Sequence, residues 1–132
     1  MRYFMAILAA LLTALPSASF ADDIKTTAQY VQACGVPVPS QDCSNTYFSS
    51  ITVRRMAKRD VKINCLPSEI AGAAAIDSSG NVIKSKQSAY ENAYRTEVNA
   101  TAQWLGKHPE LNSQGLTDSI AAAVWALYPS CK

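Results

Sequence analysis

The longest helical pattern in this chain is KQSAYENAYRTEVNATAQWLGK, residues 86–107. Aromatic and aliphatic side chains recur there at every third or fourth position, namely Tyr90, Tyr94, Val98, Ala102 and Leu105. A helix of about 20 residues spans about 30 Å, roughly the width of a small domain. The helix should stop where His108 precedes Pro109, because a residue before proline is disfavoured in helical geometry. We therefore expect this helix to be the scaffold for the other elements.

Two shorter helices are expected before it. The first should pack along a stripe at helical spacing formed by Ile24, Ala28, Val31 and Cys34. The second should start at Ser44 or Asn45, either of which can cap a helix, and run to about Lys58. Its inner face should carry Tyr47, Phe48 and Ile51.

The segment between the second helix and the scaffold helix changes pattern twice. Alternation of Val61, Ile63 and Cys65 with polar residues predicts extended chain, and Pro67 is suited to the first turn of a short helix. Five consecutive turn-forming residues then predict an exposed loop: Asp77, Ser78, Ser79, Gly80 and Asn81.

The last helix should begin after Gly115, with Thr117 as its cap, and end before Pro129. Its buried side should consist of Leu116, Ile120, Val124, Leu127 and Tyr128. Together these patterns predict a mostly α-helical fold, a small compact bundle of four to five helices with a protruding loop.

The first 21 residues, MRYFMAILAALLTALPSASFA, have the organisation of a secretory signal peptide. Arg2 precedes a short apolar run, and small residues occupy the cleavage positions before Asp22. The alternatives are a membrane anchor or a buried helix, but Pro16 interrupts the run. We expect an exported, periplasmic protein in which residues 22–132 form a single domain of 111 residues.

All four cysteines, Cys34, Cys43, Cys65 and Cys131, fall in the expected mature part, where oxidation to disulfides is the default. A metal site or redox dithiol is the less favoured alternative, because the chain has no CxxC pair. Four cysteines permit three pairings. We prefer Cys34 with Cys43, across a short proline-containing loop, and Cys65 with Cys131. Cys43 with Cys65 stays open.

Eleven basic and ten acidic residues in the mature part leave it almost neutral, which argues against a nucleic-acid partner. Positive charge is nevertheless concentrated locally, at Arg54, Arg55, Lys58, Arg59 and Lys62. This cluster is either a solvated helix face or a docking patch for an acidic partner. After removal of the leader, we expect no membrane partner.

The sequence offers no catalytic, metal-binding or cofactor-binding set, and we expect a protein that is not an enzyme. His108 is the single histidine, and its place at a helix end favours an interaction with the last carbonyls over catalysis. Trp104 and Trp125 lie beside the apolar stripes of their helices. Apolar residues on more than one helix face suggest a homodimer.

Four motifs in a fixed order resemble a known family: CSNTYF from Cys43, Cys65-Leu66-Pro67, WLGKHPEL from Trp104, and AAAVWALYPSC at the end. This order is similar to that of the Tai family, the periplasmic immunity proteins of type VI secretion systems. The resemblance covers about residues 34–131. It implies a small helical, disulfide-containing dimer that blocks the active-site groove of a papain-like peptidoglycan amidase and has no catalysis of its own.

The stretch between Pro67 and Lys86 is longer here than the simpler family pattern. Some members place a protruding loop in the amidase cleft, so residues 77–81 are the expected inhibitory element. The alternatives are a small periplasmic disulfide-bonded chaperone or general binding module, and a thiol oxidoreductase.

Overall fold

The computed structural model describes residues 24–132, so the expected signal peptide lies outside the described part. The elements are α1 (Thr27–Cys34), α2 (Gln41–Lys58), α3 (Pro67–Ala74), α4 (Lys84–Gly106), the 3-10 turn η2 (Pro109–Ser113), α5 (Leu116–Leu127) and the 3-10 turn η3 (Pro129–Cys131). Within the described residues, the only β pairing is an isolated antiparallel bridge between Ile76 and Val82. The expected mostly helical bundle is confirmed.

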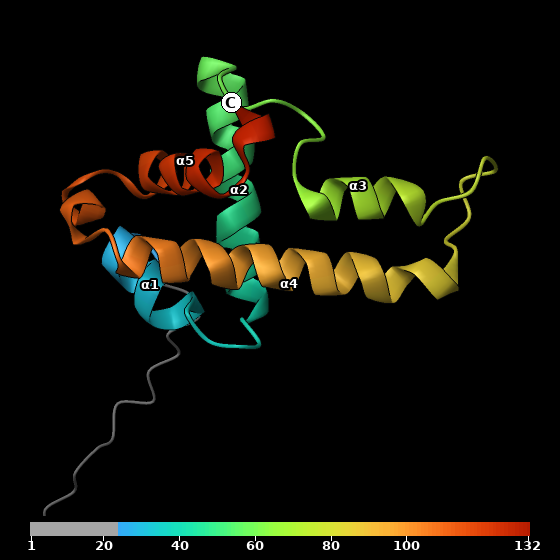
Figure 1. The fold of residues 1–132 in the computed structure, drawn as a ribbon, viewed down its shortest axis with the longest axis horizontal. Coiled ribbons are helices and arrows are strands. Elements are labelled where there is room, and N and C mark those ends of the chain that lie inside the picture. Colours follow the sequence, from blue (N-terminus) through green and yellow to red (C-terminus); the bar gives the residue numbers. More distant parts are fainter. Residues whose placement is uncertain (1–23) are drawn as a thin grey trace, which may run out of the picture.

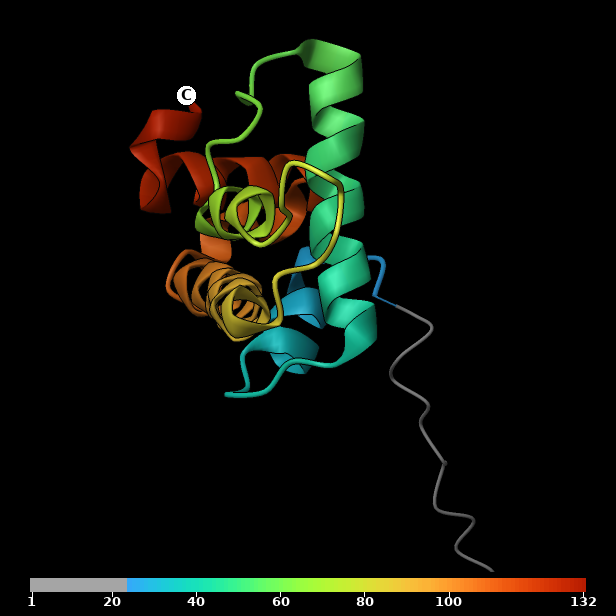
Figure 2. The ribbon, with the colours of Figure 1, turned by 90° about the vertical axis from the view of Figure 1, so that its right-hand side faces the viewer.

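Helix α4 crosses the whole molecule and organises it into two parts (Figure 1). Its C-terminal half lies against α1, α2 and α5, which form the body. Its N-terminal half extends away from the body with α3 beside it, and Figure 2 shows these two helices end-on, one above the other. We call residues 67–95 the arm.

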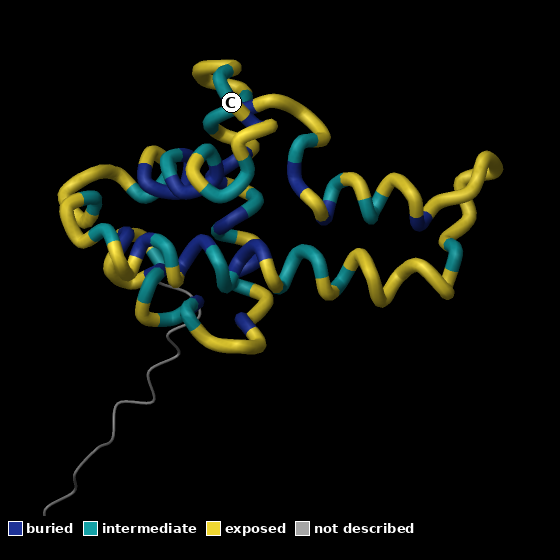
Figure 3. Tube along the Cα trace, in the orientation of Figure 1, coloured by how far each residue is buried: buried dark blue, intermediate teal, exposed yellow. Residues whose placement is uncertain are grey.

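The core lies where the body helices meet α4 (Figure 3). Its fully buried side chains include Tyr30, Tyr47, Leu66, Val98, Leu105, Ile120 and Val124. Burial of each such aliphatic side chain stabilises the fold by about 1.5–3 kcal/mol. The Tyr30 hydroxyl donates to the Val98 carbonyl (3.0 Å), so its polar end is satisfied inside the core.

The inward face of α1 differs from the predicted stripe. Thr27, Tyr30 and Cys34 are buried, whereas Ala28 is exposed. The apolar pattern failed because two of the inward residues carry hydroxyl groups. Their hydrogen bonds explain their burial: besides the Tyr30 bond, the Thr27 hydroxyl donates to Ser119 Oγ (2.9 Å).

One predicted helix start and one predicted cap were wrong, while the predicted start of the last helix after Gly115 is confirmed. Helix α2 begins at Gln41, earlier than predicted, because the Ser40 side chain accepts the Cys43 amide (3.3 Å). Helix α5 begins at Leu116 with Gly115 at the cap position, so Thr117 does not cap it. The predicted aromatic inner face of α2 is confirmed, with Tyr47 and Ile51 buried.

Residues 59–66 form an irregular loop and not the extended chain that the alternation predicted. Arg59 and Asn64 both adopt positive φ angles (53° and 58°), which turn the backbone. Val61 is therefore buried while Ile63 is exposed, although both belonged to the same predicted face.

Both preferred disulfides are present, Cys34–Cys43 and Cys65–Cys131. The first closes the short proline-containing loop, and the Gln103 side chain of α4 donates to the Gly35 carbonyl (2.8 Å) at its base. The second joins the loop before α3 to η3. Within residues 24–132, no cysteine is unpaired.

Candidate functional site

The predicted loop is the tip of the arm and lies far from the body (Figure 1). All five of its residues are exposed, and the structure keeps them together in one tight turn. The Gly80 amide donates to the Asp77 carbonyl (3.0 Å), and the Asp77 amide donates to the Asn81 carbonyl (2.9 Å). Gly80 has a φ of 83°, which suits glycine and is strained for other residues. This pattern is typical of a short β-hairpin turn.

The Asp77 carboxylate stiffens the turn from inside. Its Oδ1 atom accepts the amides of Ser79 (2.9 Å) and Asn81 (2.8 Å). The carboxylate is therefore bound to the main chain of the loop itself. The side chains at the apex, Ser78 and Ser79, are neutral. At the loop's base, Ile76 and Val82 pair across the bridge and are 53% and 59% exposed. The tip therefore presents hydroxyl groups above an apolar pair.

An aromatic ladder connects the arm to the core. Tyr90 and Tyr94 of α4 have ring centroids 5.6 Å apart, Tyr94 lies 6.4 Å from Phe48, and Phe48 lies 5.1 Å from Tyr47. The outermost ring also packs on α3, where a Cβ at Gly72 would meet Tyr90 at 3.1 Å. Glycine at this position lets the two helices of the arm approach closely.

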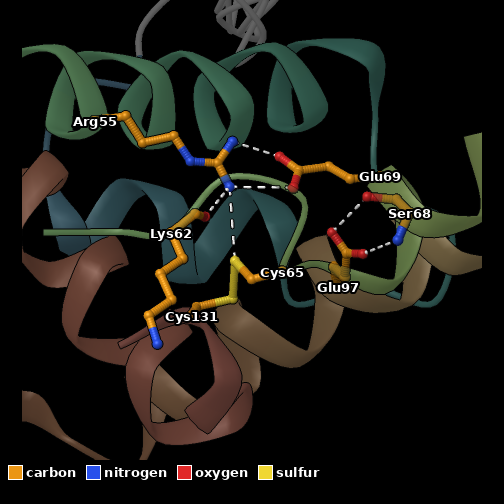
Figure 4. Close-up of a disulfide and its surroundings, with 7 residues drawn as sticks. All are labelled: Arg55, Lys62, Cys65, Ser68, Glu69, Glu97 and Cys131. Carbon is orange, nitrogen blue, oxygen red and sulfur yellow. Dashed lines mark hydrogen bonds and ion pairs between the residues drawn. A yellow bond between two sulfur atoms is a disulfide. The ribbon is translucent and has the colours of Figure 1, made fainter. Parts of the chain in front are cut away.

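The N-terminus of α3 is capped from another helix (Figure 4). The amide and hydroxyl of Ser68 donate to the two carboxylate oxygens of Glu97 on α4 (2.6 and 2.8 Å). Leu66, at the cap position, supplies no side-chain hydrogen bond, so Glu97 takes over that role. Burial raises the pKa of the Glu97 carboxyl, an effect that the two bonds from Ser68 partly oppose.

A second group of contacts ties the same turn of α3 to α2. The Arg55 guanidinium pairs with both carboxylate oxygens of Glu69 and donates to the Lys62 carbonyl (2.7 Å). The same nitrogen lies 3.6 Å from the sulfur of Cys65, in the disulfide to Cys131. Figure 4 shows these groups side by side with the Ser68–Glu97 pair. The base of the arm is therefore held by α2, α4 and the C-terminal turn.

The predicted basic patch is divided by the structure. Arg54 pairs with Asp60 and Asp118 and lies 5.1 Å from the Trp125 ring centroid, and Arg55 pairs with Glu69. The Arg54 hydrogen bond lowers the pKa of the Asp60 carboxyl. Lys58 and Arg59 are exposed at the end of α2. None of the four lies at the hairpin tip.

The residues considered for catalysis have structural partners. His108 Nδ1 lies 2.7 Å from the Trp104 carbonyl, which confirms the expected helix-end interaction, and its ring stacks on Trp104 at 3.7 Å. A hollow of about 170 Å³ between α1 and η2 is lined by residues without titratable side chains, such as Val31, Leu105 and Pro109. Residues 24–132 gather no group of three or more His, Cys, Asp or Glu that could hold a metal ion.

Both tryptophans are engaged within the chain, Trp104 by His108 and Trp125 by Arg54. Homodimer formation through these faces stays a prediction. Over the described residues, no helix is both long and apolar enough to cross a membrane.

Comparison with models of protein families, with curated proteins and with solved structures found no match for this chain.

Sequence reasoning located the hairpin but missed the residues that hold the arm. Ser68, Glu69 and Glu97 had no assigned role. One signal was available for Glu97: it lies one position before Val98, on the edge of the apolar stripe of the scaffold helix. A charged residue there needs a buried partner. That partner is Ser68, 29 positions away in the sequence, and the pattern alone could not identify it.

Proposed function

We propose that this protein is a periplasmic immunity protein that inhibits a peptidoglycan-cleaving cysteine amidase of a type VI secretion system. It acts without catalysis, by placing the hairpin of residues 77–81 in the active-site groove of the amidase. The observation that carries the proposal is the hydrogen-bonded turn at the end of the arm. The motif order described above supplies the identity of the target.

The physical argument for this proposal concerns the conformational entropy that an inhibitor loses on binding. A loop that is flexible before binding loses conformational freedom when it docks, and this loss weakens the complex. Here the tip is fixed by its own hydrogen bonds, and the base of the arm is fixed by Glu97, Arg55 and a disulfide. A projection held in this way is suited to insertion into an enzyme groove.

Two disulfides are compatible with an oxidising compartment, and we place the protein in the periplasm. Its partner should be encoded next to it, as a small amidase. The first test is co-purification of the two proteins after co-expression, followed by a wall-hydrolysis assay with purified sacculi.

The sharper test replaces one apex residue and leaves the turn intact. Deletion of the whole loop would remove the Asp77 carboxylate that organises it, so Ser79→Trp is preferable. Ser113→Trp, an equal change on an exposed residue of η2 beyond the other end of α4, is the control. We expect Ser79→Trp to raise the inhibition constant at least about tenfold, the effect of losing a central contact, while the control stays near wild type.

Inhibition by Ser79→Trp equal to that of wild type would remove the hairpin from the mechanism. Failure of the protein to inhibit any papain-like amidase, combined with protection of unrelated unfolded clients from aggregation, would favour the chaperone alternative. The exposed apolar side chains of the arm, such as Ile70 and Ile76, are the feature consistent with that alternative.

A further inference from the structure

A second surface, near the base of the arm and away from the hairpin, combines apolar and basic side chains. It surrounds the C-terminal end of α2 and consists of Val53, Met56, Lys58, Arg59, Lys62 and Ile63, which we call the α2-end surface. Its three apolar residues are among the most exposed of the described chain: Val53 is 54%, Met56 77% and Ile63 74% exposed. A group of exposed apolar side chains is typical of a surface that contacts a protein or a membrane.

The charges of the α2-end surface are all positive. The acidic residues nearby pair with arginines that lie beneath this surface: Asp60 and Asp118 share Arg54, and Glu69 pairs with Arg55. Lys58, Arg59 and Lys62 make no ion pair with any residue of the described part of the chain. These three residues belong to the basic cluster that the sequence showed at residues 54–62.

The shape of the α2-end surface is that of a projection. The end of α2 and the loop that follows it form the uppermost part of the molecule in both Figure 1 and Figure 2. The Lys62 amide donates to the Cys131 carbonyl (2.9 Å), and Arg55 binds the Lys62 carbonyl, so the loop is fixed in this place.

These features fit a lipid surface better than a protein. The cores of protein interfaces are enriched in aromatic residues, methionine and arginine and depleted in lysine. Here two of the three unpaired cations are lysines, no aromatic residue is present, and Arg54 and Arg55 pair with acidic residues of the same chain. Lysine and arginine stems can lie along apolar groups while their charges stay at the phosphate level.

We propose that the α2-end surface binds anionic phospholipid membranes, with Met56 and Ile63 entering the boundary between headgroups and acyl chains. The three cations contact lipid phosphates. Figure 1 places the hairpin at a different extremity of the molecule, so lipid contact leaves the arm accessible. This inference does not depend on the proposed inhibition.

Vesicle co-sedimentation of the processed, exported protein tests the proposal. The vesicles contain phosphatidylglycerol mixed with phosphatidylcholine, or phosphatidylcholine alone. The charge variant is Lys58→Gln/Arg59→Gln/Lys62→Gln, and the apolar variant is Met56→Ser/Ile63→Ser. The matched control removes three other exposed lysines, Lys84→Gln/Lys86→Gln/Lys107→Gln.

We expect binding to the anionic vesicles only, weakened by salt. Each cation near an anionic surface contributes about a fivefold gain in partitioning, so the charge variant should bind about a hundredfold more weakly than wild type. The apolar variant should also bind more weakly, and the control should lose less than the charge variant.

Equal binding of the charge variant and the control would overturn the proposal, as would equal sedimentation with neutral vesicles. Binding to soluble polyglutamate without binding to anionic vesicles would also overturn it, and would assign the surface to an acidic protein.

Discussion

Replacement of Glu97 by alanine should loosen the arm at its base. The Glu97 carboxylate is 1% exposed and receives two hydrogen bonds from Ser68, one of them from the main-chain amide. That amide belongs to the first turn of α3, where no carbonyl of the helix can accept it. Alanine would therefore leave a buried amide without a partner.

The size of the effect follows from two losses, that of the hydrogen-bond acceptor of the Ser68 amide and that of buried apolar volume. An unsatisfied buried amide costs about 1–3 kcal/mol, and removal of the one buried methylene group that alanine lacks, at Cγ of Glu97, adds about 1 kcal/mol. We expect the free energy of unfolding of Glu97→Ala to be about 3 kcal/mol lower than that of wild type. Glu97→Gln should cost less than about 1 kcal/mol, because the amide oxygen can accept the Ser68 amide and its nitrogen can donate to the Ser68 hydroxyl.

Urea denaturation with the disulfides intact measures both variants. At the usual dependence of stability on urea, the midpoint of Glu97→Ala should fall by about 1–3 M. Hydrogen exchange should locate the change, with the Ser68 amide losing protection in Glu97→Ala and keeping it in Glu97→Gln. Equal stability of Glu97→Ala and wild type, or equal losses in the two variants, would refute the capping role.

The two disulfides should contribute unequally to stability. Replacing both cysteines of the Cys65–Cys131 bridge by serine should lower the free energy of unfolding by about 4 kcal/mol, and the same change at Cys34–Cys43 by about 2.5 kcal/mol, because the first bridge closes the longer loop. Equal losses in urea denaturation would contradict this loop-closure argument. Gly80→Ala should destabilise the hairpin by about 1–2 kcal/mol, because its positive φ disfavours a side chain, and faster exchange of the Asp77 amide would report it. Stability should also depend on pH through Glu97. Its pKa is raised in the folded state above its ordinary 4.5, so the folded protein holds this proton more tightly than the unfolded chain, and stability falls as pH rises through that window. Glu97→Gln lacks this loss, so its stability relative to wild type should increase with pH from about 4 upward; a constant difference would contradict the assigned shift.

The sequence predicted the helices well where strong local signals mark them. Pro67 begins α3 and the His108–Pro109 pair follows the end of α4, as expected. The Cys34–Cys43 pairing was also predicted, since a short loop with two prolines brings these two cysteines together. In each case the determining residues are close in sequence.

Two predictions failed because a contact with another element outweighed the local pattern. The alternation after Asp60 indicated extended chain, but the backbone turns at Asn64, and Arg55 holds the Lys62 carbonyl. Tyr30 was overlooked on α1 because its burial depends on the Val98 carbonyl, 68 positions away. Neither partner can be identified from spacing alone.

The candidate site shows the same division. The turn at residues 77–81 was predictable, because aspartate, serine and glycine form tight turns through their own side chains or the absence of one. The stiffness of the arm was not, because it depends on Glu97 and Arg55, which reach α3 from two other helices.

This division has a consequence for how the arm works. The hairpin closes its own hydrogen bonds and should keep its shape even in a loosened molecule, whereas the direction of the arm is set by contacts with the body. Damage at Glu97 should therefore leave the turn formed but allow it to sample more orientations. Binding would then carry a larger entropy loss, so the proposed inhibition should weaken even though every residue at the tip is unchanged.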